Sequence, residues 1–160
     1  MKKFFIAFLA FYLGIIVFMP KKELFYTAQK YLSSQNIYIN AKVESNIISL
    51  ILKDAKVYIN GINLINFQKS DIYMFILYNR IEIKKITINF NNLKINKLTL
   101  TYDITNPIKI KINGKSNFGN INGIVDLKNK AIKIYILNAK DFIKRYLRKD
   151  KKGYFYYEKY

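Results

Sequence analysis

Carboxylates are the residues of this sequence suited to acid–base or metal chemistry, because the chain contains no histidine and no cysteine. Away from the termini these carboxylates are Glu44, Asp54, Asp71, Glu82, Asp103, Asp126 and Asp141. A hydrolase with paired carboxylates needs two of them to converge in a cleft. Most of them instead lie at the ends of predicted strands or opposite lysines, where turn and surface residues are found. We therefore predict no catalytic residues.

Metal and phosphate sites are disfavoured on similar grounds. Asp54 and Asp103 are the candidate metal ligands, but neither has a histidine or a cluster of carboxylates near it in the sequence. The sequence contains no glycine-rich phosphate loop and no G-x-S-x-G nucleophile elbow. Gly119 and Gly123 are predicted to be turn glycines. The expectation is a protein that is not an enzyme and that has no cofactor and no metal.

The charge of the chain needs a separate explanation. The formal net charge of +18 would suit a nucleic-acid partner, and lysines and aromatics on strands resemble a stacking sheet. However, only three of the 28 basic residues are arginine, the usual residue for bidentate contacts with phosphates and bases. The lysines are interpreted as a solvated surface set partly by AT-rich coding, or as attraction to an anionic membrane. We predict no nucleic-acid partner.

The elements that must position these residues begin with an uncharged segment, Phe4 to Met19, between lysine pairs. As a helix its sixteen residues rise ~24 Å, somewhat less than the ~30 Å core of a bilayer, and lysine stems can make up the difference. No small residues stand at the −3 and −1 positions before Pro20, so no signal-peptidase site is evident. Residues 1–19 are predicted to be an uncleaved signal-anchor, with a removable signal peptide and a buried core helix as the alternatives. The predicted anchor residues are Phe4, Phe8, Phe11, Ile15 and Phe18.

Residues 20–36 are predicted to form an amphipathic helix and a loop. Pro20 suits a first helical turn, and apolar residues then recur at helical spacing. They are Leu24, Phe25, Ala28, Tyr31 and Leu32.

From Ile37 the apolar period changes to two, which predicts a β domain over residues 37–160. Asn60-Gly61 predicts a hairpin with a type I′ turn, and the apolar run 47–52 is expected to be buried on both faces. Residues 71–78 fit either a short helix or a buried strand. Phase slips at Lys84-Lys85 and between Ile95 and Leu98 indicate β-bulges.

The C-terminal part continues the strand pattern. A strand over 108–113 and a hairpin over 121–137 are followed by a short predicted helix after Asn138. The aromatic tail Tyr154–Tyr157 fits a last strand, an interfacial anchor or a disordered segment. The predicted fold is mainly β: a transmembrane helix, a short amphipathic helix, then a twisted, mostly antiparallel open sheet with a short C-terminal helix.

Three of these stretches resemble the type II secretion system protein N family and its AsmA-like relatives. They are Pro20 to Leu32 followed by Asn36 to Asn40, Asp71 to Ile88, and the glycine-spaced hairpin Gly119 to Leu127 with Ile132 to Ile136. The resemblance implies a single-pass protein of the bacterial inner membrane with its C-terminal domain in the periplasm, and no active site. It further implies a non-enzymatic component of an envelope machine, type II secretion-like assembly, whose partners are the membrane and other envelope or secretion-system proteins.

The alternative function is a lipid or lipopolysaccharide transport module with an apolar β-groove. Lipid is then a further partner, and the candidate face for lipid or partner is Ile86, Ile88, Leu98, Leu100, Ile110 and Ile134. If the function is assembly, we expect the edge at Tyr154–Tyr157 to pair with a strand from another protein. The strand 108–113 is expected to be an edge that Pro107 and the lysines of the strand protect from such pairing. Apolar surface left uncovered along the sheet would favour the lipid-binding groove over assembly.

Overall fold

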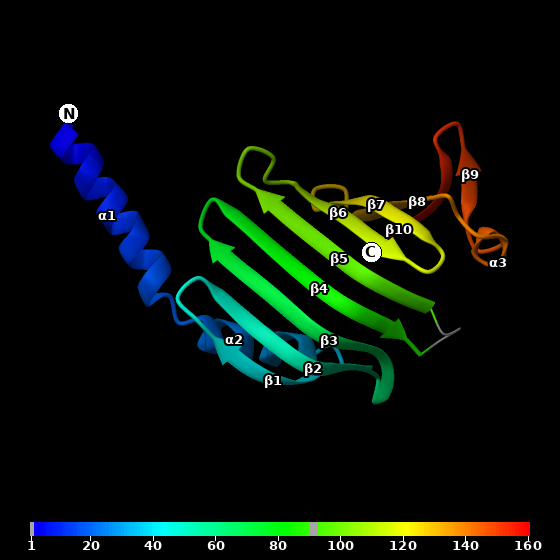
Figure 1. Ribbon diagram of the computed structural model, residues 1–160, viewed down its shortest axis with the longest axis horizontal. Helices are drawn as coiled ribbons and strands as arrows, with labels where there is room; N and C mark the ends of the chain where they lie inside the picture. The colour runs from blue at the N-terminus through cyan, green and yellow to red at the C-terminus, as the bar shows by residue number, and fades with distance from the viewer. Residues whose placement is uncertain (1, 90–92) are drawn as a thin grey trace.

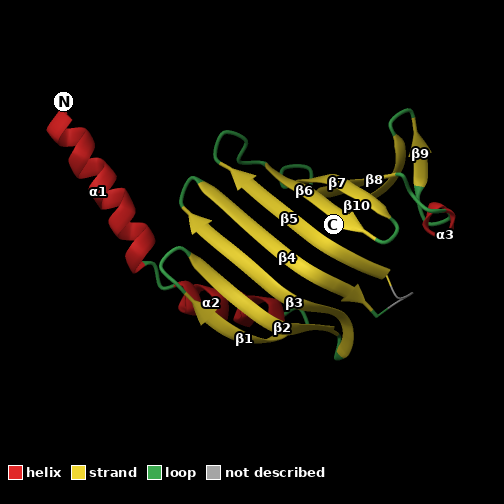
Figure 2. Cartoon of the chain, in the orientation of Figure 1, coloured by secondary structure: helices red, strands yellow, loops and turns green. Residues whose placement is uncertain are grey.

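The computed structural model of the chain describes residues 2–89 and 93–160 (Figures 1 and 2). Two helices, α1 (Lys2–Phe18) and α2 (Lys21–Ser33), precede the strands. The strands are β1 (Ile37–Ser45), β2 (Ser49–Ile59), β3 (Ile62–Phe75), β4 (Tyr78–Ile88), β5 (Leu93–Asp103), β6 (Lys109–Ser116), β7 (Gly119–Asp126), β8 (Ala131–Leu137), β9 (Arg148–Asp150) and β10 (Gly153–Lys159). A short helix α3 (Asp141–Lys144) lies between β8 and β9. Phe90, which continues the predicted strand pattern, lies outside the described residues.

All ten strands form one open antiparallel sheet, and this confirms the predicted fold class at that level. Each strand from β1 to β8 pairs with the next one along the chain, and β10 then lies between β8 and β9. The hairpin at Asn60-Gly61 is as predicted: φ is 51° and 78° at these residues, the positive values that a type I′ turn requires. The ambiguous segment 71–78 is strand, because β3 and β4 pair along their whole length up to the turn Ile76-Leu77.

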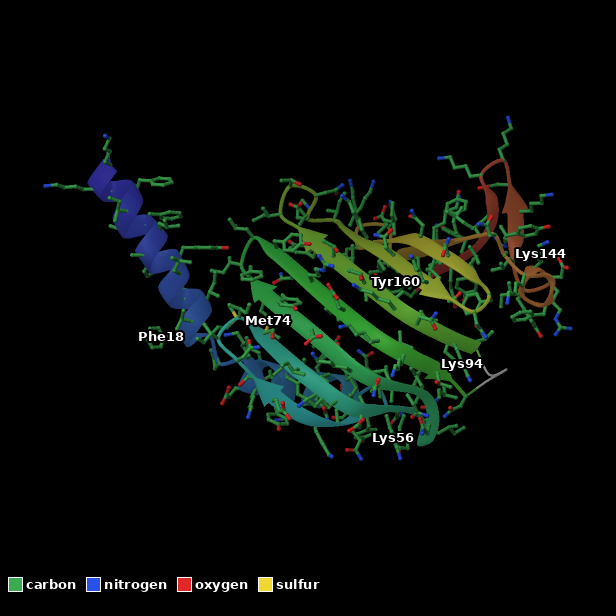
Figure 3. All side chains as sticks on the ribbon, viewed as in Figure 1. Phe18, Lys56, Met74, Lys94, Lys144 and Tyr160 are labelled. Carbon is green, nitrogen blue, oxygen red and sulfur yellow. The ribbon has the colours of Figure 1, made fainter. Side chains whose placement is uncertain are left out.

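This up-and-down order gives the sheet two distinct ends. The α1–α2 junction lies at one end, called here the near end, together with the turns at 46–48, 76–77, 104–108 and 127–130 (Figure 1). At the opposite, far end lie the loop at 34–36 and the turns at 60–61 and 117–118. Figure 3 shows Phe18 and Met74 on the side of the near end and Lys94 on the side of the far end. The two ends differ in the amino-acid composition of their turns.

The predicted phase slips belong to a crease that crosses four strands. Asp54, Gln68, Lys85 and Asn96 occupy one row, and each is an extra exposed residue between an outward-facing lysine and an inward-facing apolar residue. Asp54 and Lys85 have φ of 50° and 52°. The register shifts by one residue on both sides of this row, between Asn40 and Lys42 and between Ile95 and Lys97. Because all four strands slip together, their shared register survives, so the slip at Lys84-Lys85 is not a bulge with two residues against one. The bulge predicted between Ile95 and Leu98 is confirmed against β6, where the register shifts.

Helix α2 packs on β1 and, at fewer positions, on β2. Its buried face differs from the predicted stripe: Phe25 is buried, whereas Leu24 and Tyr31 are exposed. Lys21 is also buried, and its ammonium donates a 2.9 Å hydrogen bond to the carbonyl oxygen of Ile16. That contact satisfies one of the last carbonyls of α1 with a cation, which favours the bend between the helices.

Several finer predictions are wrong. In the run 47–52, Ile47 and Ile48 form an exposed turn, Ser49, Leu50 and Leu52 are buried, and Ile51 is half-buried. The strand at 108–113 is interior, so Pro107 does not protect an edge. The predicted short C-terminal helix, in contrast, is present as α3, over four residues; Tyr146 and Leu147 lie beyond it, and β9 pairs with β10 from Arg148 onward.

Candidate functional site on the inner face of the sheet

The two faces of the sheet have opposite chemistry, and the strand register defines them. The inner face is the face on which Leu52 lies. Its apolar members form two adjacent rows: Val43, Leu52, Ile83, Leu98, Ile121 and Ile136, then Leu50, Ile72, Ile81, Leu100, Ile112 and Ile134. The buried core also lies on this side, with Phe25 of α2 packed against it.

All six residues of the predicted apolar face lie on the inner face. Leu98, Leu100 and Ile134 belong to the rows just named. Ile110 lies on β6 two residues from Ile112, and Ile86 and Ile88 lie beyond the crease on β4. Ile86 is buried, whereas the other five are half-buried. The register therefore brings the predicted set together, although it does not test what the set binds.

The inner face is covered at its margins rather than across its middle. Helix α2 contacts β1 and β2, and Phe118 of the β6–β7 turn and Ile143 of α3 join the core at the far end. Strands β3 to β8 make their main contacts with their neighbours in the sheet. Between these covers, Ile72, Ile81 and Leu100 remain half-buried. Apolar surface of this kind is what the lipid alternative requires.

A pocket of about 400 Å³ opens at the near end of the inner face. Its lining joins the α1–α2 junction to β3 and β4: Met19, Leu24, Ile72, Tyr73, Met74, Phe75, Ile76, Asn79 and Ile81. Ile72, Met74 and Ile81 are inner-face residues, so the pocket continues directly onto that face. The sequence interpretation missed this site because Met19 and Leu24 are some fifty residues from their strand partners. The alternation of Ile72 and Met74 within 71–78 was the available signal.

The predicted anchor residues all lie on the exposed surface of α1. Phe4, Phe8, Phe11, Ile15 and Phe18 are exposed, Phe18 by 84%. Other apolar residues around the helix, such as Leu9 and Val17, are exposed as well, which is inconsistent with a buried core helix. Neither described helix is by itself long and apolar enough to cross a membrane; α1 and α2 together, bent by 61°, meet that requirement by length and composition.

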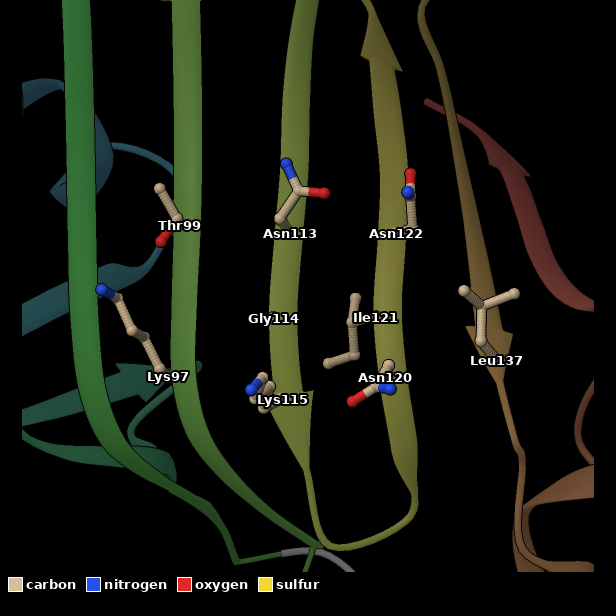
Figure 4. Close-up of a pocket in the computed structure, with 9 residues that line it drawn as sticks. All are labelled: Lys97, Thr99, Asn113, Gly114, Lys115, Asn120, Ile121, Asn122 and Leu137. Carbon is tan, nitrogen blue, oxygen red and sulfur yellow. The ribbon is translucent and has the colours of Figure 1, made fainter.

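The outer face carries a row of lysines at right angles to the strands. Direct cross-strand partners follow one another over six strands: Lys42, Lys53, Lys69, Lys84, Lys97 and Lys115. Neighbours in such a row stand about 4.8 Å apart along the sheet, so like charges lie side by side. The row borders two shallow pockets, one at the crease and one over β5 to β8 (Figure 4).

Carboxylates neutralise part of this lysine row. Lys53 pairs with Glu44 at 2.7 Å, Lys69 with Asp71 at 2.9 Å and Lys97 with Glu82 at 3.0 Å. The hydrogen bond from Lys97, together with Arg80, holds the pKa of Glu82 below its ordinary value. Within the described residues no carboxylate lies within 4 Å of the Lys84 ammonium.

The remaining carboxylates have structural positions. Asp103 accepts a 2.9 Å hydrogen bond from the Thr105 amide and Asp126 accepts one from the Asn129 amide, so both stabilise turns as predicted. Asp141 pairs with Lys144. Across residues 2–89 and 93–160 no three or more carboxylates gather where a metal ion could be held. Of the candidate carboxylates, the register places Asp71 directly opposite Glu82 on the outer face, where Asp71 pairs with Lys69 and Glu82 with Arg80 and Lys97. On the inner face the geometry brings together an apolar surface and a pocket.

Comparison with protein-family models, with curated proteins and with solved structures finds no match to this chain.

Proposed function

We propose that the protein is a non-enzymatic, membrane-anchored module that holds the acyl chains of lipids against the inner face of its sheet. The observation that carries the proposal is the apolar pocket at the α1–α2 junction, which continues onto the half-buried inner face. Helix α1 would anchor the chain in the bacterial inner membrane, with the sheet on the periplasmic side. Lipid could then pass from the bilayer to the inner face without crossing water.

Burial energetics support this proposal. Moving apolar surface out of water contributes about 25 cal/mol for each Å², so an uncovered row of isoleucine and leucine gains from an apolar ligand. Pockets that bind small molecules are mostly apolar with few polar groups. The pocket lining follows that pattern, since Asn79 and the Tyr73 hydroxyl are its polar side-chain groups.

Photocrosslinking in native membranes tests the proposal. Benzoylphenylalanine in place of Leu100 is expected to yield lipid adducts, because this residue faces inward on β5. The same probe in place of Thr101 is the matched control, because the next residue of a strand points to the other face. Equal adducts at both positions, or none at Leu100, would contradict lipid binding by the inner face.

A second proposal is type II secretion-like assembly through a sheet edge. It is supported by the edge of β10, where β9 covers Gly153 to Phe155 and leaves Tyr156 to Lys159 paired only with β8. An uncovered strand edge is a template for another strand. A photocrosslinker in place of Glu158 should then yield protein adducts that the same probe in place of Lys111, on interior strand β6, does not.

A further inference from the structure

The turns at the near end of the sheet carry apolar residues at their tips. Seven of these residues are exposed and are named here the near-end rim: Ile47, Ile48, Ile76, Leu77, Ile104, Ile108 and Leu127. They come from four separate hairpin connections, between β1 and β2, β3 and β4, β5 and β6, and β7 and β8. Alternating strand direction places all four connections at the same end of the sheet (Figure 1).

Turn geometry does not explain these apolar side chains. In the β1–β2 turn the Asn46 carboxamide oxygen accepts hydrogen bonds from the Ile48 and Ser49 amides, at 3.0 and 2.7 Å. Asp103 and Asp126 stabilise two of the other turns in the same way. Polar residues thus fix the turns, and exposed turn tips are ordinarily polar. Ile47 is 65% exposed and gains little from packing within the chain.

The far-end turns within residues 2–89 and 93–160 lack this pattern. The described turns and strand ends of the far end carry asparagine: Asn36, Asn60, Asn89, Asn117 and Asn138. Phe118 at this end is buried. Exposed apolar residues occur there as well: Ile62 beside the Asn60-Gly61 turn, Leu137 at the end of β8, and Phe142 and Tyr146 near α3. Among the hairpin turns that the structure describes, exposed apolar tips are therefore gathered at the near end.

We propose that the near-end rim inserts into the interface of the bilayer in which α1 is anchored. Three observations favour a bilayer over a protein partner. Helix α1 ends at this same end and is apolar around its whole exposed circumference. Lys22, Lys128 and Lys130 lie beside the rim, where cations contact anionic headgroups. The mouth of the apolar pocket includes Ile76, a rim residue, so insertion would place that mouth at the acyl chains.

This inference rests on the proposed anchorage of α1 and not on lipid binding by the inner face. It is tested with the full chain in vesicles of phosphatidylcholine and phosphatidylglycerol with brominated acyl chains, which quench tryptophan fluorescence. The chain has no tryptophan of its own, so a single one reports alone. The rim variants are Ile47→Trp and Ile104→Trp, neither of which lines the pocket. The far-end control is Ile62→Trp, at 63% exposure, and Phe11→Trp reports on α1.

The rim variants are expected to show blue-shifted emission and quenching, Phe11→Trp strong quenching, and Ile62→Trp neither. Quenching of Phe11→Trp without quenching of either rim variant would overturn the rim contact and leave the anchorage standing. Absence of quenching at Phe11 would overturn the anchorage; quenched rim variants would then show a peripheral contact only. Equal quenching of Ile62→Trp and the rim variants would overturn the inference, because both ends would meet lipid alike.

Discussion

Leu52 and Lys53 are neighbours on β2, yet they meet opposite surroundings. Leu52 is 3% exposed and packs in the core of the inner face, whereas Lys53 lies on the outer face between two other lysines. The inner face gains free energy from burial, while the outer face loses some through like-charge pairs that carboxylates only partly neutralise. The comparison indicates that burial of the apolar inner face stabilises the sheet. This stabilisation offsets the repulsion among the lysines of the outer face.

The largest expected effect comes from truncating the inner face. Leu52→Ala should lower the free energy of unfolding by about 2–5 kcal/mol, because it removes buried methyl groups and leaves a cavity. The measurement is denaturant unfolding of the full chain in detergent or nanodiscs. Ile62→Ala is the matched control at an exposed position and should change stability by less than about 0.5 kcal/mol. Comparable losses in both variants would contradict the assignment of the core to this face.

A second test adds a methyl group to the inner face at a glycine that has no free space around it. Gly123 pairs with Ile112 and Ile134, and a Cβ atom there would lie 2.8 Å from the carbonyl oxygen of Lys133. Gly123→Ala is therefore expected to destabilise the sheet by about 1–3 kcal/mol, since backbone must shift to relieve the clash. Asn122→Ala, on the exposed neighbouring position, is the control. A neutral Gly123→Ala would mean that β7 and β8 separate at little cost.

On the outer face a substitution should stabilise. Lys84 stands between Lys69 and Lys97, so Lys84→Gln removes two like-charge pairs. The expected gain is about 0.2–1 kcal/mol at low ionic strength, and it should shrink as salt screens the lysine row. Thermal unfolding of both proteins at low and high salt measures it. A loss of stability, or a gain that salt does not change, would show that repulsion in the row is unimportant.

The smallest expected effect is a pH dependence from the carboxylates of the outer face. The pKa of Glu82 is lowered in the folded chain, chiefly by the Lys97 hydrogen bond. A lowered folded-state pKa contributes stability that is present above the unfolded-state value, about 4.3, and is lost as pH falls through the folded-state value. The free energy of unfolding of the native chain should therefore decrease in this acid range more than that of Glu82→Gln, as measured by denaturant unfolding at a series of pH values. Parallel pH profiles would refute the contribution.

Sequence periodicity predicted the parts of the fold that depend on neighbouring residues. The alternation from Ile37 to Glu44, the Asn60-Gly61 turn and the slip at Lys84-Lys85 each leave a local pattern. The lysine row could not be predicted in this way, because it depends on the register of five strand pairs. The pocket at Met19 and the position of β10 depend on contacts between distant segments. The sequence around the rim residues is typical of strand ends or of a buried run. Their exposure could not be predicted, because it depends on contacts between segments that are distant in the sequence.

The strict up-and-down order of the sheet also constrains how the chain can change in length. Each connection from β1 to β8 joins adjacent strands, so a new hairpin of two strands between two of them would keep every later turn at its present end. A single inserted or deleted strand would instead exchange the ends of all turns that follow. The isoleucine tips after that point would then lie among the asparagine turns, on the side away from α1. Relatives of this chain should therefore differ from it by even numbers of strands.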